Sequence, residues 1–487
     1  MDSEKYDLEK NDTINSETEK LTDINNTCSV LIVKSQNNIH RKCEQEYVIK
    51  VYQKRWFLLA LFIIITALNG IQWVQYSIIT NITMRYYGIT SRMVDYTSLI
   101  YLITYLPLVL PASYFMDKYG MRATLVTASL GNCIGCWFKV LSADPDKFYI
   151  GFMGQFVLSC TQLVIISTPS SFAAVWFGAN EVSTACALGV FGQQLGMALG
   201  FILPPLMIRN HEELDSIGKD FYRFFMLNAI ITTVVLVLTI IFCQKQPEYP
   251  PSKAQALIRE GKAASDNSVM ETVKSFKRLL KQKSFLTLLA VFGVTLGVFN
   301  SFCTFLNQVI LVYFAGGQVF AGQVGLVVTI AGMVGSSIIG YILDKTKKYK
   351  ITAIIVIIMS TIGLILFMIS LRTKSYTLVF AASAFLGLFI TTFISVAYEY
   401  AVELTYPEPE ANTAGLMSAF STFTGVLGIV LFGDIIEYYG EFLYHVMLCA
   451  FMMISVILSF LVSNKLKRQA VIILEKKQYQ LSAGSEK

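Results

Sequence analysis

The feature that most constrains this chain is a series of apolar runs, each about 20 residues long, separated by polar turns. An α-helix rises about 1.5 Å per residue, so a run of this length crosses the hydrocarbon core of a bilayer. The runs are Trp56–Ile82, Tyr96–Phe115, Ala123–Leu141, Phe148–Phe177, Val182–Ile208, Phe224–Cys243, Phe285–Phe314, Val324–Leu343, Ile351–Leu371, Leu378–Val402, Thr413–Ile436 and Phe442–Val462. We therefore expect an all-α membrane protein with twelve transmembrane helices.

The polar segments divide these helices into two sets of six, with a hydrophilic stretch rich in Lys and Arg between them. We expect a disordered cytoplasmic tail over 1–54, a six-helix bundle over 55–243, a basic cytoplasmic linker over 244–284, a second six-helix bundle over 285–466 and a cytoplasmic tail over 467–487. Only 15% of the residues are charged, against about a quarter in soluble domains. No nucleophile elbow, phosphate loop or metal-ligand spacing is present, so we expect neither an enzyme nor a cofactor.

The distribution of Lys and Arg predicts the orientation of the chain. The linker and the turns after the second and eighth helices carry most of the basic residues, including Lys118, Arg122 and Lys345. Basic loops remain on the cytoplasmic side of a membrane. Both termini are therefore expected on the cytoplasmic side. We expect a monomer in the plasma membrane, with a mitochondrial or other internal membrane as the alternative. The glycosylation sequon at Asn81 lies on the outer side, too near the bilayer to be used.

Two similar turns occupy the same place in each set of six helices. Asp117-Lys118-Tyr119-Gly120-Met121-Arg122 follows the second helix, and Gly340-Tyr341-Ile342-Leu343-Asp344-Lys345 follows the eighth. A single turn of this kind reflects only the preference of Asp, Gly and Lys for turns. The repeat favours an alternating-access transporter in which Asp117, Lys118, Arg122, Asp344 and Lys345 act in gating. The turns resemble the loop motif of the major facilitator superfamily, except at Ser113 and Thr346-Lys347-Lys348.

Longer stretches resemble the feline leukaemia virus subgroup C receptor family. These are Asn69–Tyr76, Trp176–Cys186, Phe305–Gln308, Ala331–Ser336 and Glu403–Glu408. The resemblance extends from about Arg55 to Leu466. It implies a major-facilitator fold that transports choline or ethanolamine, and haem export has also been attributed to the family.

Trp73 lies inside the first helix beside several amides, and Asn69 is on the same helix face four residues away. One interpretation is a packed indole whose N–H bonds a neighbouring helix. The other is a site for a quaternary ammonium, which cannot donate an N–H bond and is attracted to an aromatic face. The resemblance places a cation-binding Trp at Trp73 and its Asn at Asn69.

Three further residues complete the predicted substrate site. The resemblance assigns a substrate contact to Gln162, although an interhelical hydrogen bond explains it equally well. Vertebrate relatives have Tyr where this chain has Asn300 and Gln where it has Thr422, so one aromatic wall is missing. Asn300 and Thr422 suit a substrate with more hydrogen-bond donors, such as ethanolamine.

Few acids lie deep in the predicted helices, and Glu399 and Glu403 fit pairing or gating better than proton coupling. We therefore hypothesise facilitated diffusion, driven inward by the membrane potential. Haem export is a competing hypothesis, but His40, His211 and His445 all lie away from mid-membrane. A receptor that binds solute without transport is a third, which the short tails do not favour.

Overall fold

The computed structural model describes residues 49–463 and 469, apart from 167, 179, 180, 253, 254, 256–267 and 409. The two predicted tails therefore lie largely outside the described residues. The side chains of Asp117 and Asp344 are also outside the described part.

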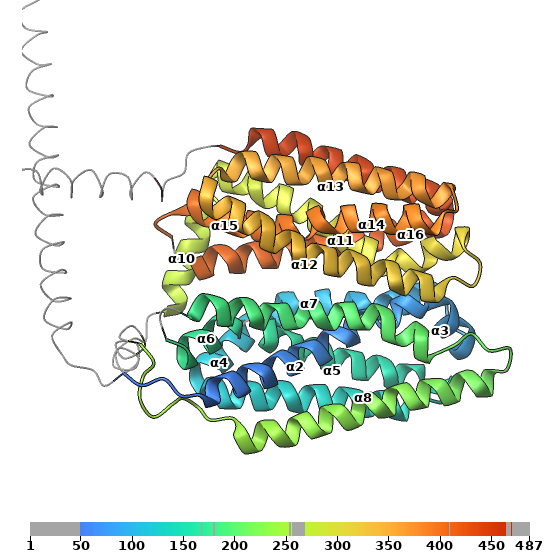
Figure 1. The fold of residues 1–487 in the computed structure, drawn as a ribbon, viewed down its shortest axis with the longest axis horizontal. Helices are drawn as coiled ribbons and strands as arrows, with labels where there is room; N and C mark the ends of the chain where they lie inside the picture. Colours follow the sequence, from blue (N-terminus) through green and yellow to red (C-terminus); the bar gives the residue numbers. More distant parts are fainter. Residues whose placement is uncertain are drawn as a thin grey trace, which may run out of the picture.

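The N-terminal half consists of one set of helices, which lies in the lower part of Figure 1. Its elements are α2 (Lys54–Val74), η1 (Ser77–Ile79), α3 (Thr80–Tyr87), α4 (Ser91–Leu141), η2 (Pro145–Lys147), α5 (Phe148–Ile166), α6 (Pro169–Trp176), α7 (Val182–Met207) and α8 (Leu214–Phe242).

The C-terminal half lies above it in Figure 1, and the amphipathic helix α10 (Ser268–Leu279) precedes it. Its elements are α11 (Lys283–Tyr313), α12 (Gln318–Thr346), α13 (Tyr349–Arg372), α14 (Tyr376–Ile390), α15 (Thr392–Thr405) and α16 (Glu410–Leu461). The sequence did not lead us to expect α10.

The two longest helices each reverse direction at a glycine. Gly120 in α4 has φ +78° and Gly440 in α16 has φ +83°. Both values lie in the left-handed region that residues with a Cβ rarely adopt. Each helix therefore crosses the membrane twice. Since α2 continues into α3, α5 into α6 and α14 into α15, the described helices make twelve crossings, which confirms the predicted fold class.

Helix α8 begins at Leu214, ten residues before the predicted start at Phe224. Its first turns carry Asp215, Lys219 and Arg223, which a hydropathy criterion excludes. The helix continues past its apolar segment because backbone hydrogen bonding depends little on the polarity of exposed side chains. Hydropathy thus predicted the apolar part of α8 and not its full length.

Helices α2 and α7 pack with their backbones almost in contact. A Cβ added to Gly196 would lie 2.1 Å from the Ala67 carbonyl oxygen, and one added to Gly192 would lie 2.2 Å from Thr66 Oγ1. Only glycine permits this approach, as in other membrane helix pairs. This close packing fixes the position of α2 in the N-terminal half.

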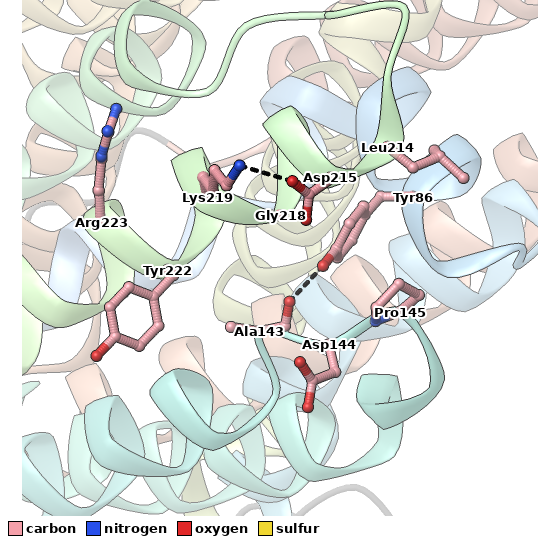
Figure 2. Close-up of a pocket in the computed structure, with 10 residues that line it drawn as sticks. All are labelled: Tyr86, Ala143, Asp144, Pro145, Leu214, Asp215, Gly218, Lys219, Tyr222 and Arg223. Carbon is pink, nitrogen blue, oxygen red and sulfur yellow. Dashed lines mark hydrogen bonds and ion pairs between the residues drawn. The ribbon is translucent and has the colours of Figure 1, made fainter.

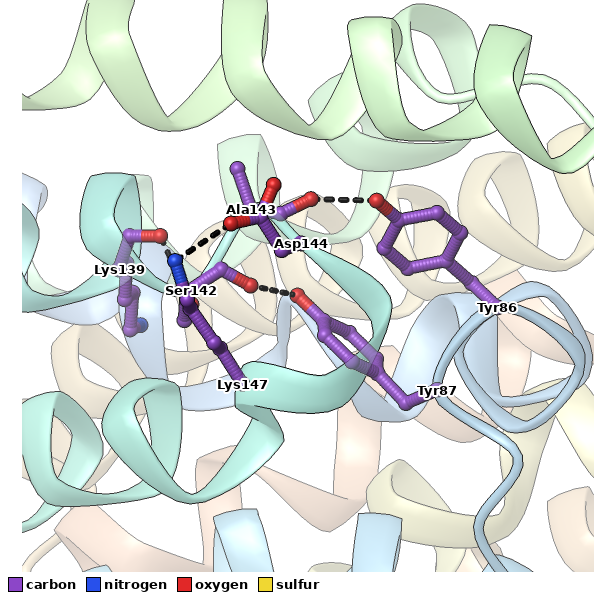
Figure 3. Close-up of polar contacts among 7 residues, drawn as sticks. All are labelled: Tyr86, Tyr87, Lys139, Ser142, Ala143, Asp144 and Lys147. Carbon is purple, nitrogen blue, oxygen red and sulfur yellow. Dashed lines mark hydrogen bonds and ion pairs between the residues drawn. The ribbon is translucent and has the colours of Figure 1, made fainter.

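The helix ends form two faces, named here by what lies at them. The linker end carries Gly120 and α10, and the opposite end carries α3 and Gly440, at the right in Figure 1. At the opposite end, the hydroxyl of Tyr86 donates to the Ala143 carbonyl and that of Tyr87 to the Ser142 carbonyl at 2.9 Å (Figure 3). These bonds fasten α3 to the loop that follows α4.

Polar contacts join the two halves at the opposite end. Arg92 of α4 forms ion pairs with Asp434, at 3.0 Å, and with Glu437, both on α16. The side-chain amide of Asn307 on α11 donates to the Ile78 carbonyl of η1 at 2.7 Å. These contacts close the opposite end between the halves.

Candidate substrate site

Trp73 is the one residue between Ile65 and Thr80 that is not buried. The residues before and after it in this stretch are all buried, whereas Trp73 is partly buried and packs against the core. The indole nitrogen itself is buried and has no hydrogen-bond partner among the described residues. The packing interpretation predicts such a partner on a neighbouring helix, and none is present among the described residues. A contact between the Trp73 ring and a ligand stays a prediction.

Asn69 lies one turn from Trp73 and is fully buried in the N-terminal half. Its Nδ2 donates to Asn132 Oδ1 at 2.9 Å and to the Leu158 carbonyl at 3.1 Å. Asn132 in turn donates to the Ile65 carbonyl at 3.1 Å. These bonds link α2, α4 and α5, so Asn69 holds the helix that carries Trp73. Substrate contact by Asn69 stays a prediction.

Gln162 on α5 is half-buried, and its side chain makes no hydrogen bond to another described residue. It lies one turn beyond Leu158, which is level with Asn69, toward the linker end. Along the helix axes, Gln162 and Trp73 are therefore about 12 Å apart at about 1.5 Å per residue. Helical side chains tilt toward the start of their helix, and α2 and α5 run in opposite directions, so these two side chains lean toward one another.

Asn300 and Thr422 belong to the C-terminal half, on α11 and α16. The Asn300 amide nitrogen lies 2.8 Å from where a Cβ on Gly425 would be, so the absent side chain makes room for it. Thr422 is largely buried, and its hydroxyl donates to the Ser418 carbonyl at 2.8 Å. This leaves the lone pairs of the Thr422 hydroxyl able to accept a bond.

The contact between Asn307 and Ile78 gives the relative depth of the two halves of the site. Trp73 precedes Ile78 by five residues, or about 7 Å, and Asn300 precedes Asn307 by seven, or about 10 Å. Both therefore lie at similar depth, on the linker side of the closed end. Leu102 of α4 also approaches Gly425, since its Cδ1 lies 3.0 Å from the position that a Cβ on this glycine would take. Trp73 and Asn300 thus lie at similar depth, and Asn300 lies beside Gly425 and Leu102, where α16 and α4 of the two halves face each other. Substrate contact by Gln162 and Thr422 stays a prediction.

The predicted gating turns can be described only in part. Lys118 Nζ lies 5.5 Å from the ring centroids of Tyr114 and Tyr119, and Lys345 Nζ lies 4.5 Å from that of Tyr341. Arg122 donates to the Ile240 carbonyl at 3.3 Å. These contacts remain within one half each. A gating role for Asp117 and Asp344 stays a prediction, because their side chains lie outside the described part.

The sequence analysis missed a buried cation, Lys139 in the last turns of the third apolar run. Its side chain is 1% exposed, its Nζ donates to Gln72 Oε1 at 2.8 Å, and it lies 5.2 Å from the Tyr76 ring centroid. Gln72 also donates to Asn228 Oδ1 at 3.2 Å. A charge inside an apolar run marks a functional position by default, and a survey of charges within the runs would have found it.

A second missed residue is Asp95, which precedes the second apolar run by one position. It is 5% exposed, and Gln308 Nε2 donates to its Oδ1 at 2.9 Å. Gln308 belongs to α11, so this bond also joins the halves. Of the acids that were considered, Glu399 is exposed and Glu403 accepts a bond from the Gln469 backbone at 3.2 Å.

A cavity of about 580 Å³ lies at the opposite end, away from Trp73 (Figure 2). Its lining comes from α3, from the loop after α4 and from α8, with Asp215 and Lys219 paired at 2.6 Å. All of these elements belong to the N-terminal half. A substrate passing between the halves would not traverse it, so it is separate from the candidate substrate site.

Twelve crossings arranged in two halves are typical of a transporter of the major-facilitator class. Residues 58–433 match the family model of the Major Facilitator Superfamily. The fold is similar to a bacterial homolog of the human lysosomal transporter Spinster, with TM-score 0.63 and 12% identity over 86% of this chain and 99% of that chain. It also resembles the fucose transporter FucP in its outward conformation, with TM-score 0.59 and 12% identity over 85% of this chain and 100% of that one.

Sequence relatives narrow the class. The chain is 40% identical to choline/ethanolamine transporter flvcr2b of Danio rerio, over 86% of each chain. It is 37% identical to choline/ethanolamine transporter FLVCR2 of Homo sapiens, over 87% of this chain and 80% of that one. It is also 38% identical to the uncharacterized MFS-type transporter C09D4.1 of Caenorhabditis elegans, over 90% of this chain and 73% of that one. The chain belongs to the feline leukaemia virus subgroup C receptor family of major-facilitator transporters.

Proposed function

We propose that this protein carries choline or ethanolamine across a membrane by alternating access, as a facilitative carrier without ion coupling. The observation that carries the proposal is Trp73, which is only partly buried, whose indole N–H has no partner among the described residues and whose depth matches that of Asn300. An aromatic face binds an organic cation with about 0.5–2 kcal/mol. The names of the vertebrate relatives support the same substrates.

The placement of the basic residues supports an orientation of the protein in the membrane. With the linker end on the cytoplasmic side, as the Lys and Arg bias favours, the opposite end faces outward and is closed by Arg92 and Asn307. The structure then corresponds to a carrier whose site faces inward. We further propose a plasma-membrane location with both termini in the cytosol, and a monomer as the working unit.

Counterflow in proteoliposomes tests the carrier proposal directly. Vesicles loaded with unlabelled choline should accumulate labelled choline or ethanolamine without any imposed ion gradient. Binding of the label without exchange would instead indicate a receptor. With the membrane potential clamped, uptake that disappears when the proton or sodium gradient is removed would refute the uncoupled mechanism.

Trp73→Leu tests the site. The variant keeps an apolar side chain but removes the aromatic face, so the KM for choline should rise about 2- to 30-fold. Trp137→Leu is the matched control, because Trp137 is 41% exposed and its Nε1 donates to Thr233 at 3.1 Å. An unchanged KM in Trp73→Leu, or an equal change in both variants, would contradict a cation–π site at Trp73.

Haem export is the weaker candidate. His211 is bound to Asp220 at 2.9 Å, and His445 is buried with its Nδ1 2.8 Å from the Glu441 carbonyl oxygen. In the described part of the chain no group of three or more His, Cys, Asp or Glu could hold a metal. His40 lies outside the described residues. Competition among choline, ethanolamine and haem against one labelled substrate separates the candidates.

A further inference from the structure

A groove of about 420 Å³ at the linker end has no part in the proposed substrate path. It lies between the second segment of α4 and the end of α8, both in the N-terminal half. Its lining residues are Tyr119, Arg122, Ala123, Val126, Ile240 and Lys245. The groove is thus lined both by polar or charged side chains and by aliphatic side chains.

Two cations are held in this groove by contacts with uncharged groups. Arg122 donates to the Ile240 carbonyl at 3.3 Å. The stem of Lys245 lies over Gly120, where a Cβ would come within 3.1 Å of Lys245 Cε. In the described part of the chain, neither cation has an ion pair with a carboxylate. Because Gly120 has no Cβ, it also leaves space for the aliphatic part of the Lys245 side chain.

The groove lies at the boundary between the apolar and polar parts of the protein. The candidate membrane spans here are Lys118–Leu141 and Leu214–Phe242. Ala123, Val126 and Ile240 lie inside these spans, whereas Lys245 follows the end of one. A molecule filling the groove would therefore place its apolar part beside the hydrocarbon and an anionic group beside the two cations.

We propose that this groove binds an acidic phospholipid from the leaflet at the linker end. The two cations attract an anionic headgroup, and each contributes about 1 kcal/mol near a charged surface, which is about a fivefold change in binding. The aliphatic wall distinguishes a lipid from a soluble anion, because a free phosphate ion gains nothing from Val126 and Ile240. Basic pockets between helix ends are recognised sites for such lipids.

The test uses the full-length protein in nanodiscs of phosphatidylcholine with and without phosphatidylglycerol, with bound lipid measured by native mass spectrometry. The double variant Arg122→Gln/Lys245→Gln should retain phosphatidylglycerol about 25-fold more weakly. Lys347→Gln/Lys348→Gln is the matched control, since it removes the same charge at the same end but outside the groove. Ala123→Phe keeps both charges and occupies the groove, so it should also lose the lipid.

Each outcome decides the proposal. Selective loss in the double variant and in Ala123→Phe, with the control unchanged, supports a phospholipid site. Equal loss in the control would mean general surface attraction and overturn it. Displacement of phosphatidylglycerol by soluble glycerol 3-phosphate would indicate a site for free phosphate groups and would overturn the lipid assignment. Because Ala123→Phe preserves the charges, a double variant that fails to fold still leaves the proposal testable.

Discussion

Arg92 links the two halves at the opposite end, and its removal should favour the outward-facing state. Its guanidinium pairs with Asp434 and Glu437 and lies 5.3 Å from the Tyr438 ring centroid. Asp434 and Glu437 are three residues apart on α16 and so share a helix face. One side chain of the N-terminal half is thus held by one turn of the C-terminal half.

The size of the effect follows from exposure. The Arg92, Asp434 and Glu437 side chains are 38%, 53% and 41% exposed, so solvent screening keeps each ion pair weak. Two such pairs and the Tyr438 ring act together on the closed opposite end. Arg92→Gln should therefore shift the ratio of the two states about 5- to 30-fold. The buried bond from Asn307 to Ile78 remains, so the variant should still close part of the time.

Hydrogen–deuterium exchange measured by mass spectrometry follows this shift without labels. In Arg92→Gln, peptides covering α3 and the segment around Gly440 should exchange faster, because the end they cover opens more often. Arg85→Gln is the matched control, since Arg85 donates within the N-terminal half, to Asn210 at 3.1 Å and to the His211 carbonyl at 2.8 Å. Unchanged exchange in Arg92→Gln, or the same increase in Arg85→Gln, would refute the reasoning. A double variant with Glu437→Gln should be less than additive.

Two further substitutions probe the frame around Trp73. Gly196→Val places side-chain atoms against the Ala67 backbone and should destabilise the protein by about 1–3 kcal/mol or more in thermal unfolding. Gly415→Val is the control and should not destabilise it, because a Cβ at Gly415 meets nothing within 4 Å. Equal melting temperatures of the two variants would contradict the packing argument. Lys139→Met replaces a buried ammonium whose described contacts, Gln72 and the Tyr76 ring, are neutral, so thermal stability should be maintained or increased. Lys139→Ala should cost about 2–3 kcal/mol of stability through lost packing. A large loss of thermal stability in Lys139→Met would show that the charge itself is essential.

The sequence could predict the twelve crossings because bilayer thickness fixes helix length, and the runs obey it whatever their neighbours. It could not predict contacts that depend on how the two halves meet. Arg92 and Glu437 are 345 residues apart, and nothing local to either residue indicates the other. Trp73 was predicted as a site residue from its amide neighbours and the family resemblance, but only the three-dimensional packing shows that its N–H has no partner among the described residues. Lys139 was missed because a run was judged by its average hydropathy and not by its single charge.

Asn300 offers the sharpest test of substrate preference, because the family resemblance implies an aromatic residue at this position. Asn300→Tyr would add a second aromatic face opposite the half that carries Trp73, and the side chain at position 300 borders Gly425, which has no Cβ. Choline, whose ammonium cannot donate an N–H bond, should gain about 0.5–2 kcal/mol, or about 2- to 30-fold in affinity. Ethanolamine should gain less, because its ammonium loses the Asn300 amide as a hydrogen-bond acceptor. The measurement is the ratio of the two inhibition constants against labelled choline in proteoliposomes. Asn300→Leu supplies similar bulk without an aromatic face, so an equal change in that variant would assign the effect to apolar volume and not to cation–π attraction.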